Sequence, residues 1–186
     1  MRTFVALLRA VNVGGTGKLP MADFRALLKK LGYVNIETYI QSGNAVFDAA
    51  GKPAEIAAVL AAALEKLTGA PVGVIIRTHE ELGRVIAENP FAAEAAADGA
   101  RVHVGFLAGP AGKGAKAALD GIVAKYPARR DRYHLAGDTL YFHFPDGAGE
   151  TKFSGKTLDR AIGVIATGRN WNTVLKLHAM SARTSR

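Results

Sequence analysis

This chain contains no cysteine, and that absence removes several kinds of chemistry at once. Without cysteine there is no disulfide framework, no thiolate metal site and no thiol nucleophile. Long apolar runs are missing too, because none approaches the roughly 18 residues that a membrane helix needs. The start briefly resembles a signal peptide, but Arg9 and Asn12 interrupt it and no small-residue cleavage pattern follows. These absences predict a cytoplasmic protein.

Recognisable catalytic signatures are also missing. The chain has no Gly-x-Ser-x-Gly nucleophile turn and no His-x-x-x-His pair. Its five histidines are scattered in sequence, and no carboxylate is evidently placed beside them to complete a metal or acid–base set. The sequence therefore predicts no metal and no cofactor. It leaves open whether the protein is an enzyme.

What the chain does have is an ordinary globular composition with an uneven excess of positive charge. Of 186 residues, 49% are apolar and 22% are charged, which excludes wholesale disorder. The formal charge is +8, and residues 151–186 alone hold seven lysines and arginines against the single Asp159. Localised positive charge attracts nucleic acid or another polyanion. The alternative is a solvated helix face followed by a frayed tail.

Hydrophobic periodicity divides the chain into two similar halves. In the first half, strands are predicted at 3–8, 36–41, 45–48 and 72–77, with helices starting at Pro20 and Pro53. In the second, strands are predicted at 102–107, 132–135, 139–144 and 163–167, with helices at 113–126 and 154–162 and a final helix at 170–180. Each half reads βαββαβ, the order of a ferredoxin-like sandwich.

The predicted fold is therefore α+β, with two tandem ferredoxin-like units and a C-terminal helix. The expected domains are residues 1–78 and 101–186. Residues 79–100 are predicted to connect them through a helix, in which Thr78 and Glu81 form a capping box, and an alanine-rich linker at 92–100.

A polar, glycine-rich loop at residues 9–18 lies between the first strand and the first helix. Glycines let a backbone approach a ligand closely, and a helix start offers free N–H groups to anions. The loop is not an ATP-binding P-loop, because Asn12 and Leu19 stand where glycine and a hydroxyl residue are required. It is not a dinucleotide fingerprint either, because Pro20 replaces the third glycine.

What survives is a pair of helix N-termini, each with glycines and a lysine, Lys18 in one and Lys156 in the other. Either could bind an anion. The second fails as a P-loop because its spacer, counted from Gly149, has five residues rather than four. The alternative is that the glycines only turn the chain.

Two further polar segments are candidates for a site. Gln41-Ser42-Gly43-Asn44 forms a predicted hairpin turn whose amide groups either face a ligand or bond their own backbone. Arg169-Asn170-Trp171-Asn172-Thr173 precedes the last helix. There an asparagine is first a helix cap and a lone tryptophan is first a core anchor, although together they could bind a base or a sugar.

Strand alternation in the second half suggests one more surface. Arg101, His103, Tyr141 and His143 are predicted to be neighbours on the sheet face away from the helices. RNA-recognition domains use that face, with aromatic side chains, to stack bases. The alternative is that this face is covered within the fold.

Three of these segments, in this order and spacing, resemble one known family. They are Phe4 to Gly15, Tyr39 to Asn44 and Arg169 to Thr173, and residues 140–147 followed by Lys152 resemble a fourth family segment. The chain is identified as similar to the bacterial Domain of Unknown Function 1697 family across its whole length. The resemblance implies tandem ferredoxin-like domains and no established activity. The family positions carried over as candidate site residues are Arg9, Asn12, Gly14, Gly15, Gln41, Ser42, Asn44, Arg169, Asn170 and Asn172.

The leading functional hypothesis is a cytoplasmic binding protein for nucleic acid or a nucleotide-like anion. The alternatives are an enzyme acting on a small phosphorylated or acidic metabolite, and a protein-interaction scaffold. The complete set of predicted ligand-binding residues adds Lys18, Lys156 and Trp171 to the ten family positions. No membrane partner is expected, and the oligomeric state is left open.

Overall fold

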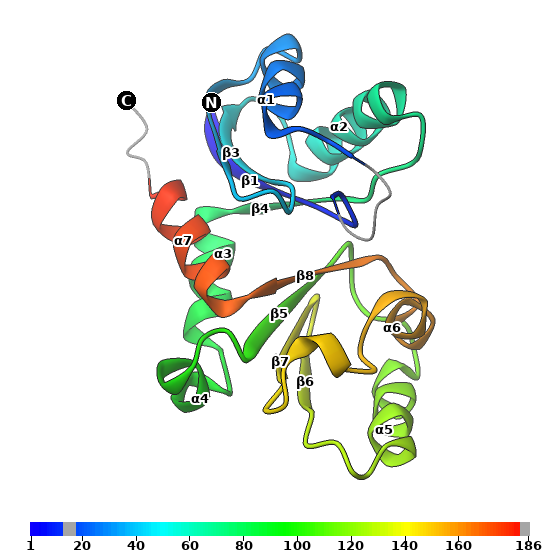
Figure 1. Ribbon diagram of the computed structural model, residues 1–186. Coiled ribbons are helices and arrows are strands. Elements are labelled where there is room, and N and C mark those ends of the chain that lie inside the picture. The colour runs from blue at the N-terminus through cyan, green and yellow to red at the C-terminus, as the bar shows by residue number, and fades with distance from the viewer. Residues whose placement is uncertain (13–17, 183–186) are drawn as a thin grey trace. The chain divides into compact units, whose positions relative to one another are not determined.

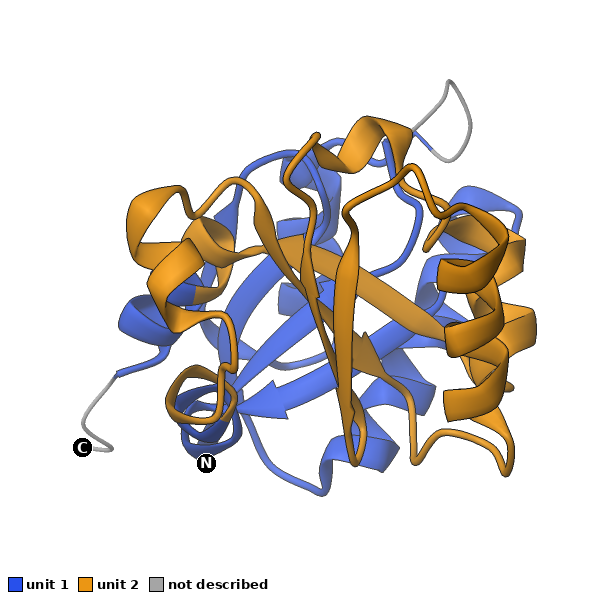
Figure 2. Cartoon of the chain, turned by 90° about the horizontal axis from the view of Figure 1, so that it is seen from below, with its two compact units in different colours: residues 1–84, 175–186 blue, residues 85–174 orange. Residues whose placement is uncertain are grey.

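The structure is a computed structural model that describes residues 1–12 and 18–182. It contains two compact units, residues 1–84 with 175–186 and residues 85–174 (Figure 2). We call them unit 1 and unit 2. Among the residues described, no helix has both the length and the apolar character that crossing a bilayer demands.

Unit 1 contains the first four-stranded sheet and two helices on one of its faces (Figure 1). Its sheet has the order β2-β3-β1-β4, and all neighbouring strands are antiparallel. The elements are β1 (Arg2–Leu8), α1 (Met21–Lys30), β2 (Val34–Tyr39), β3 (Asn44–Ala49), α2 (Pro53–Thr68) and β4 (Val74–Thr78).

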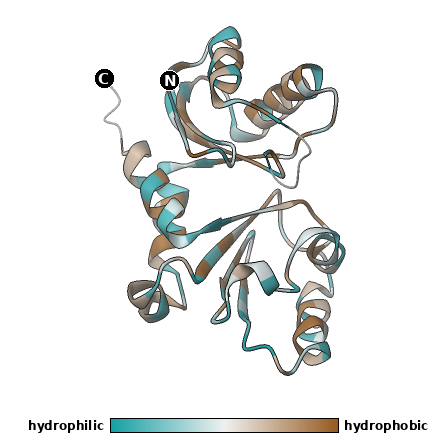
Figure 3. Cartoon of the chain, in the orientation of Figure 1, coloured by the Kyte–Doolittle hydropathy of each residue, from teal (hydrophilic) through white to brown (hydrophobic). Residues whose placement is uncertain are grey.

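The core of unit 1 follows from period-2 strands meeting period-3.6 helices. Phe4, Ala6 and Leu8 of β1 pack with buried residues of both helices in one hydrophobic cluster. Helix α2 presents Ile56, Leu60 and Leu64 to that cluster. Figure 3 shows apolar and polar residues mixed along each helix, as expected for elements with only one buried face.

Unit 2 repeats the topology, with the sheet order β6-β7-β5-β8 and antiparallel pairing throughout. Its hydrophobic cluster includes Leu107, Leu140 and Phe142 from the sheet and Leu119 and Ile162 from the helices. The elements are α4 (Ala92–Ala97), β5 (Val102–Leu107), α5 (Ala115–Lys125), β6 (Arg132–Ala136), β7 (Thr139–His143), η1 (Ala148–Glu150), α6 (Gly155–Ile162) and β8 (Ala166–Asn170). The predicted fold class, two tandem α+β ferredoxin-like units, is confirmed.

Two local predictions are wrong, one in the second half and one in the connecting segment. The last strand was expected at 163–167, but Gly163 adopts a left-handed conformation (φ +73°) that ends α6, and β8 spans Ala166–Asn170. Arg169 is therefore a strand residue rather than a loop residue. The alanine-rich segment expected as a linker contains helix α4, in keeping with the high helix propensity of alanine.

Helix α3 (His79–Ala87) begins at the predicted capping box. The Thr78 backbone N–H donates to Glu81 Oε2 at 2.7 Å, and the Glu81 N–H donates to Thr78 Oγ1 at 3.2 Å. The unit boundaries fall within α3 and within helix α7 (Trp171–Ser181). Residues 175–186 group with unit 1, whereas the sequence placed all of 101–186 in the second domain.

The contact between α3 and α7 explains this grouping. The rings of His79 and His178 stack with centroids 4.1 Å apart and planes 10° apart. The Ser181 hydroxyl donates to the His178 carbonyl at 2.8 Å, which leaves its oxygen to accept from His79 Nδ1 at 3.0 Å. His79 is therefore protonated on Nδ1 in this arrangement.

This stacked pair predicts an acid-sensitive fold. Burial lowers the pKa of His178 from its ordinary 6.5, and the neighbouring His79 lowers it further. A histidine with a lowered folded pKa stabilises the fold above its ordinary pKa, and that stability is lost as pH falls through the folded value. We expect the urea concentration at the unfolding midpoint to decrease as the pH is lowered from about 7.5 to about 5.5.

His178→Gln should reduce this pH dependence in urea unfolding. Burial also lowers the pKa of His103 and His143, so the dependence is reduced rather than abolished. The control is His134→Gln, at an exposed histidine of β6. Equal pH dependence in wild type and His178→Gln would contradict the prediction.

Candidate functional site

The first predicted site segment, at the end of β1, is held by hydrogen bonds within unit 1. Asn12 has a left-handed backbone (φ 57°). Its side-chain amide both donates a hydrogen bond to the Leu19 backbone and accepts one from it. Nδ2 donates to the Leu19 carbonyl at 2.9 Å, and Oδ1 accepts from the Leu19 N–H at 2.8 Å. Nδ2 also donates to the Gln41 carbonyl at 2.8 Å. Asn12 thus joins two of the predicted site segments. Gly14 and Gly15, also predicted site residues, lie outside the described residues.

The turn between β2 and β3 packs directly against the end of β1. Asn44 is fully buried, and its Nδ2 donates to the Tyr39 carbonyl at 3.1 Å and to Ser42 Oγ at 2.9 Å. The Leu8 N–H donates to the Gly43 carbonyl at 2.8 Å. Through these bonds Asn44 stabilises the turn between β2 and β3.

The remaining predicted residues of unit 1 differ in their exposure. Lys18 and Gln41 are exposed, whereas Arg9 and Ser42 are half-buried. The Arg9 backbone N–H donates to the Gly73 carbonyl at 2.9 Å, which ties the start of the loop to the residue before β4. The structure therefore brings Asn12, Gln41 and Ser42 together, and their role in ligand binding stays a prediction.

The predicted segment of unit 2 is largely occupied by its own fold. Arg169 is 7% exposed, and its Nη1 donates to Thr167 Oγ1 at 2.9 Å and to the Gly168 carbonyl at 2.7 Å. Burial lowers its pKa to about 10, so it stays charged at neutral pH. The Asn170 side chain accepts from the Thr173 N–H at 2.9 Å and so caps α7.

The other two residues of that segment pack against unit 2. Trp171 is 7% exposed, as expected for a core anchor. The Asn172 side chain lies over Gly99, where an added Cβ would come within 2.3 Å of Asn172 Oδ1. Their ligand-binding role also stays a prediction.

The expected row of Arg101, His103, Tyr141 and His143 on one sheet face is wrong. In the register of β5 with β7, His103 pairs with Phe142 and Val104 pairs with Tyr141. Directly paired residues of antiparallel strands share a face, so His103 lies on the helix side with Phe142. Tyr141 lies on the other face, where it is 1% exposed and its hydroxyl donates to the Val85 carbonyl at 3.1 Å.

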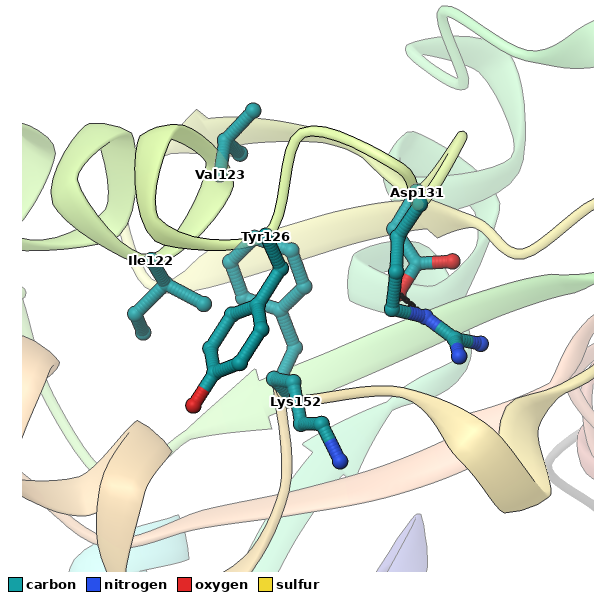
Figure 4. A pocket seen from close by; sticks show the side chains of 7 residues that line it. Ile122, Val123, Tyr126, Asp131 and Lys152 are labelled. Atoms are coloured by element: carbon teal, nitrogen blue, oxygen red, sulfur yellow. Dashed lines mark ion pairs between the residues drawn. The ribbon is translucent and has the colours of Figure 1, made fainter.

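A cluster that sequence reasoning missed lies where α5 ends in unit 2. It consists of Lys125, Tyr126, Arg129, Asp131 and Lys152, and we call it the Tyr126 cluster. Figure 4 labels Tyr126, Asp131 and Lys152 of this cluster. The ammonium groups of Lys125 and Lys152 lie 5.7 Å and 5.6 Å from the centre of the Tyr126 ring. Both distances suit a cation–π contact, so the ring holds two positive charges near one another.

The Arg129–Asp131 ion pair forms the polar wall of this cluster (Figure 4). Arg129 Nε lies 3.5 Å from Asp131 Oδ2, which also accepts from Thr151 Oγ1 at 2.9 Å. Among the described residues, Arg129 Nε and Nη2 and Asp131 Oδ1 are buried without a hydrogen-bond partner. Beyond their ion pair, Arg129 Nη2 and Asp131 Oδ1 therefore have hydrogen-bonding capacity that the described residues do not use.

The hollow at the Tyr126 cluster is small, with a volume of about 10 Å³. That is room for about one water molecule, so a single ligand oxygen can enter, while a ring cannot. Among the residues that the structure describes, no group of three or more His, Cys, Asp and Glu side chains is placed to hold a metal ion. The sequence signal for the cluster was the run Arg129-Arg130-Asp131, which belonged to no predicted element.

Comparison with known proteins gives a family and a fold. A family model described as "Protein of unknown function (DUF1697)" matches residues 1–141. A solved structure of the conserved bacterial protein SP0830 from Streptococcus pneumoniae superposes with a TM-score of 0.61 at 22% identity, covering 96% of this chain and 98% of that one. No curated protein matches the chain. At that identity the structural likeness shows the fold alone.

Proposed function

Since this chain belongs to the DUF1697 family, whose description names no activity, we propose its function from geometry and charge: it binds nucleic acid or a nucleotide-like anion. The observation that carries the proposal is the Arg129 guanidinium, whose Nε faces Asp131 in an ion pair while its Nη2 is buried without a hydrogen-bond partner among the described residues. A guanidinium matches a phosphate in geometry and charge better than any other side chain does.

The charges around Arg129 support a phosphate as its partner. Lys125 and Lys152 add two ammonium groups on one ring, and Lys156 is exposed in the first turn of α6, four residues after Lys152. The carboxylate of Asp131 is already paired with Arg129. The balance at this end of unit 2 is therefore positive.

The hollow has room for a single ligand oxygen, which is either a phosphate oxygen on Arg129 or a hydroxyl on Asp131. Asp131 Oδ1 has no hydrogen-bond donor among the described residues. A sugar hydroxyl is a donor that carboxylates bind in nucleotide sites. Because Tyr126 is engaged by two lysines, the cluster supplies phosphate contacts rather than base recognition, and we expect little sequence preference.

Some of the site residues predicted from the sequence belong to this proposal and others do not. Lys156 adjoins the Tyr126 cluster in sequence, whereas the Arg169 guanidinium already bonds Thr167 and Gly168 and is left out. In unit 1, the exposed Lys18 and Gln41 remain available to the same class of ligand as a separate prediction.

A salt titration tests the proposal. Fluorescence anisotropy with labelled single-stranded RNA and DNA should show binding at low salt that weakens as salt rises. Lys125→Gln/Lys152→Gln should weaken binding about fivefold or more and reduce the slope of log K against log salt by about 2, since each lost phosphate contact lowers it by about 1. ATP should compete with the labelled RNA and DNA if a single nucleotide is enough to occupy the site.

The matched control is Lys113→Gln, an exposed lysine in the loop before α5. It removes one positive charge from the same unit, half of what the double variant removes, and it should leave both affinity and slope nearly unchanged. Absence of binding at low salt would overturn the proposal. So would binding that ignores salt, or equal losses in the control and the double variant.

A further inference from the structure

A second concavity lies in unit 1, between α1 and the start of β2. It has a volume of about 520 Å³, within the range of small-molecule sites. One turn of α1 supplies Arg25, Ala26 and Lys29, and the chain leading into β2 supplies Tyr33, Val34 and Ile36. We call it the α1–β2 groove.

The groove is open because β2 is an edge strand with an irregularity at this point. The pairing of β2 with β3 shifts between Val34 and Glu37, so the strand carries one extra residue there. A bulge of this kind bends the strand and breaks the ladder. Val34 is 42% exposed as a result, although its side chain is apolar.

The walls of the groove are held by specific contacts. The Tyr33 ring stacks on Phe47 with centroids 4.8 Å apart and planes 7° apart. Arg25 Nη1 donates to Thr38 Oγ1 at 2.6 Å, which aligns the guanidinium along β2. Asn35 Nδ2 donates to Asp48 Oδ2 at 2.7 Å, so the bulged segment is tied to β3. The groove is therefore largely preformed.

Its lining combines positive charge with apolar surface. Arg25 and Lys29 are four residues apart on α1, so they share one helix face. None of the eight lining residues is acidic. Burial raises the pKa of Tyr33 above its ordinary 10.0, so its hydroxyl stays protonated at neutral pH. Every charged group in the lining therefore favours an anion.

We propose that the α1–β2 groove binds a small apolar molecule carrying one carboxylate. The carboxylate contacts Lys29 and Arg25, and the apolar body lies on Val34, Ile36 and Ala26. Two cations within one helical turn match a single anionic group rather than a chain of phosphates, and the apolar half of the lining has no use in binding a polyanion. This inference is independent of the nucleic-acid proposal.

Amide chemical shifts of the full chain in NMR test it, with 4-phenylbutyrate as the probe and 4-phenylbutanamide as its uncharged analogue. The acid should produce saturable shifts at α1 and at residues 32–36, the segment that lines the groove. The amide should bind about fivefold more weakly, because it offers no charge to Lys29. Equal binding of acid and amide, or shifts confined to other residues, would overturn the proposal.

Matched lysine variants complete the experiment. Lys29→Gln should weaken binding of the acid about threefold, while Lys30→Gln, at the exposed neighbour outside the groove, should not. Equal effects of the two variants would also overturn the proposal. Lys125→Gln/Lys152→Gln should bind the acid like wild type, so loss of either site is recognised separately.

Discussion

Gly43→Ala is expected to destabilise the protein by about 3 kcal/mol, the sum of a left-handed backbone cost and an overpacking cost. Gly43 has φ +77°, and a Cβ there would lie 2.5 Å from Val11 Cγ2 and 2.7 Å from Leu8 Cβ. Neither neighbour is the end of a long flexible side chain. The turn must therefore move away from β1, breaking the bond from the Leu8 N–H to the Gly43 carbonyl.

Gly32→Ala separates the two causes. Gly32 has a similar backbone angle, φ +82°, but an added Cβ would meet nothing within 4 Å. It should cost only about 1 kcal/mol, the backbone cost alone. Urea unfolding of the wild type, Gly32→Ala and Gly43→Ala measures the difference in the free energy of unfolding. Equal losses in Gly32→Ala and Gly43→Ala would show that the close approach to Leu8 and Val11 carries no energy.

Arg129→Ala is expected to cost about 3 kcal/mol of stability, because it leaves a buried carboxylate without its cation. The Asp131 side chain is 5% exposed, and among the residues that the structure describes the substitution leaves it the Thr151 Oγ1 donor at 2.9 Å alone. This variant therefore tests the fold of the Tyr126 cluster, which is why the binding experiment changes the lysines instead.

The neighbouring arginine is a matched control. Arg130 pairs with Asp146 at the surface, where the two side chains are 70% and 39% exposed. Exposed pairs contribute about 0–1 kcal/mol, so Arg130→Ala should have a small effect in the same urea experiment. The two alanine variants remove the same side chain one residue apart. Similar losses in both would contradict the assignment of Arg129 to a buried pair.

The candidate site was only partly predictable. Pattern matching identified Asn12, Asn44 and Asn170, and each of them makes side-chain bonds to its own unit. A polar residue at a turn or cap has the same sequence signature whether it faces a ligand or its own backbone. Only the positions of Leu19, Tyr39 and Thr173 distinguish the two.

Charge in sequence was also an incomplete guide to charge on the surface. The basic C-terminal segment suggested an anion-binding surface, yet Arg169 within it is buried and bonded. The Tyr126 cluster instead draws its cations from two separate segments, at 125–129 and at 152. Residues brought together from separate elements leave no local pattern to read.

By itself the sequence determined the features that depend on neighbours within about four residues. These are the βαββαβ order of each unit, the capping box of Thr78 and Glu81, and the apolar face of α2. The absence of cysteine likewise excluded thiol chemistry from the outset.

Tertiary structure alone decided the features that depend on pairing and burial. The register of β5 with β7 puts His103 on the helix side of the sheet and Tyr141 on the other face. The alternation of side chains along each strand was correct in the sequence, but it did not show which faces of the two strands coincide. A shift of one residue reverses every such assignment, and alternation within one strand contains no information about its partner's register. For the same reason the Tyr126 cluster and the α1–β2 groove became visible only once segments distant in sequence were packed together.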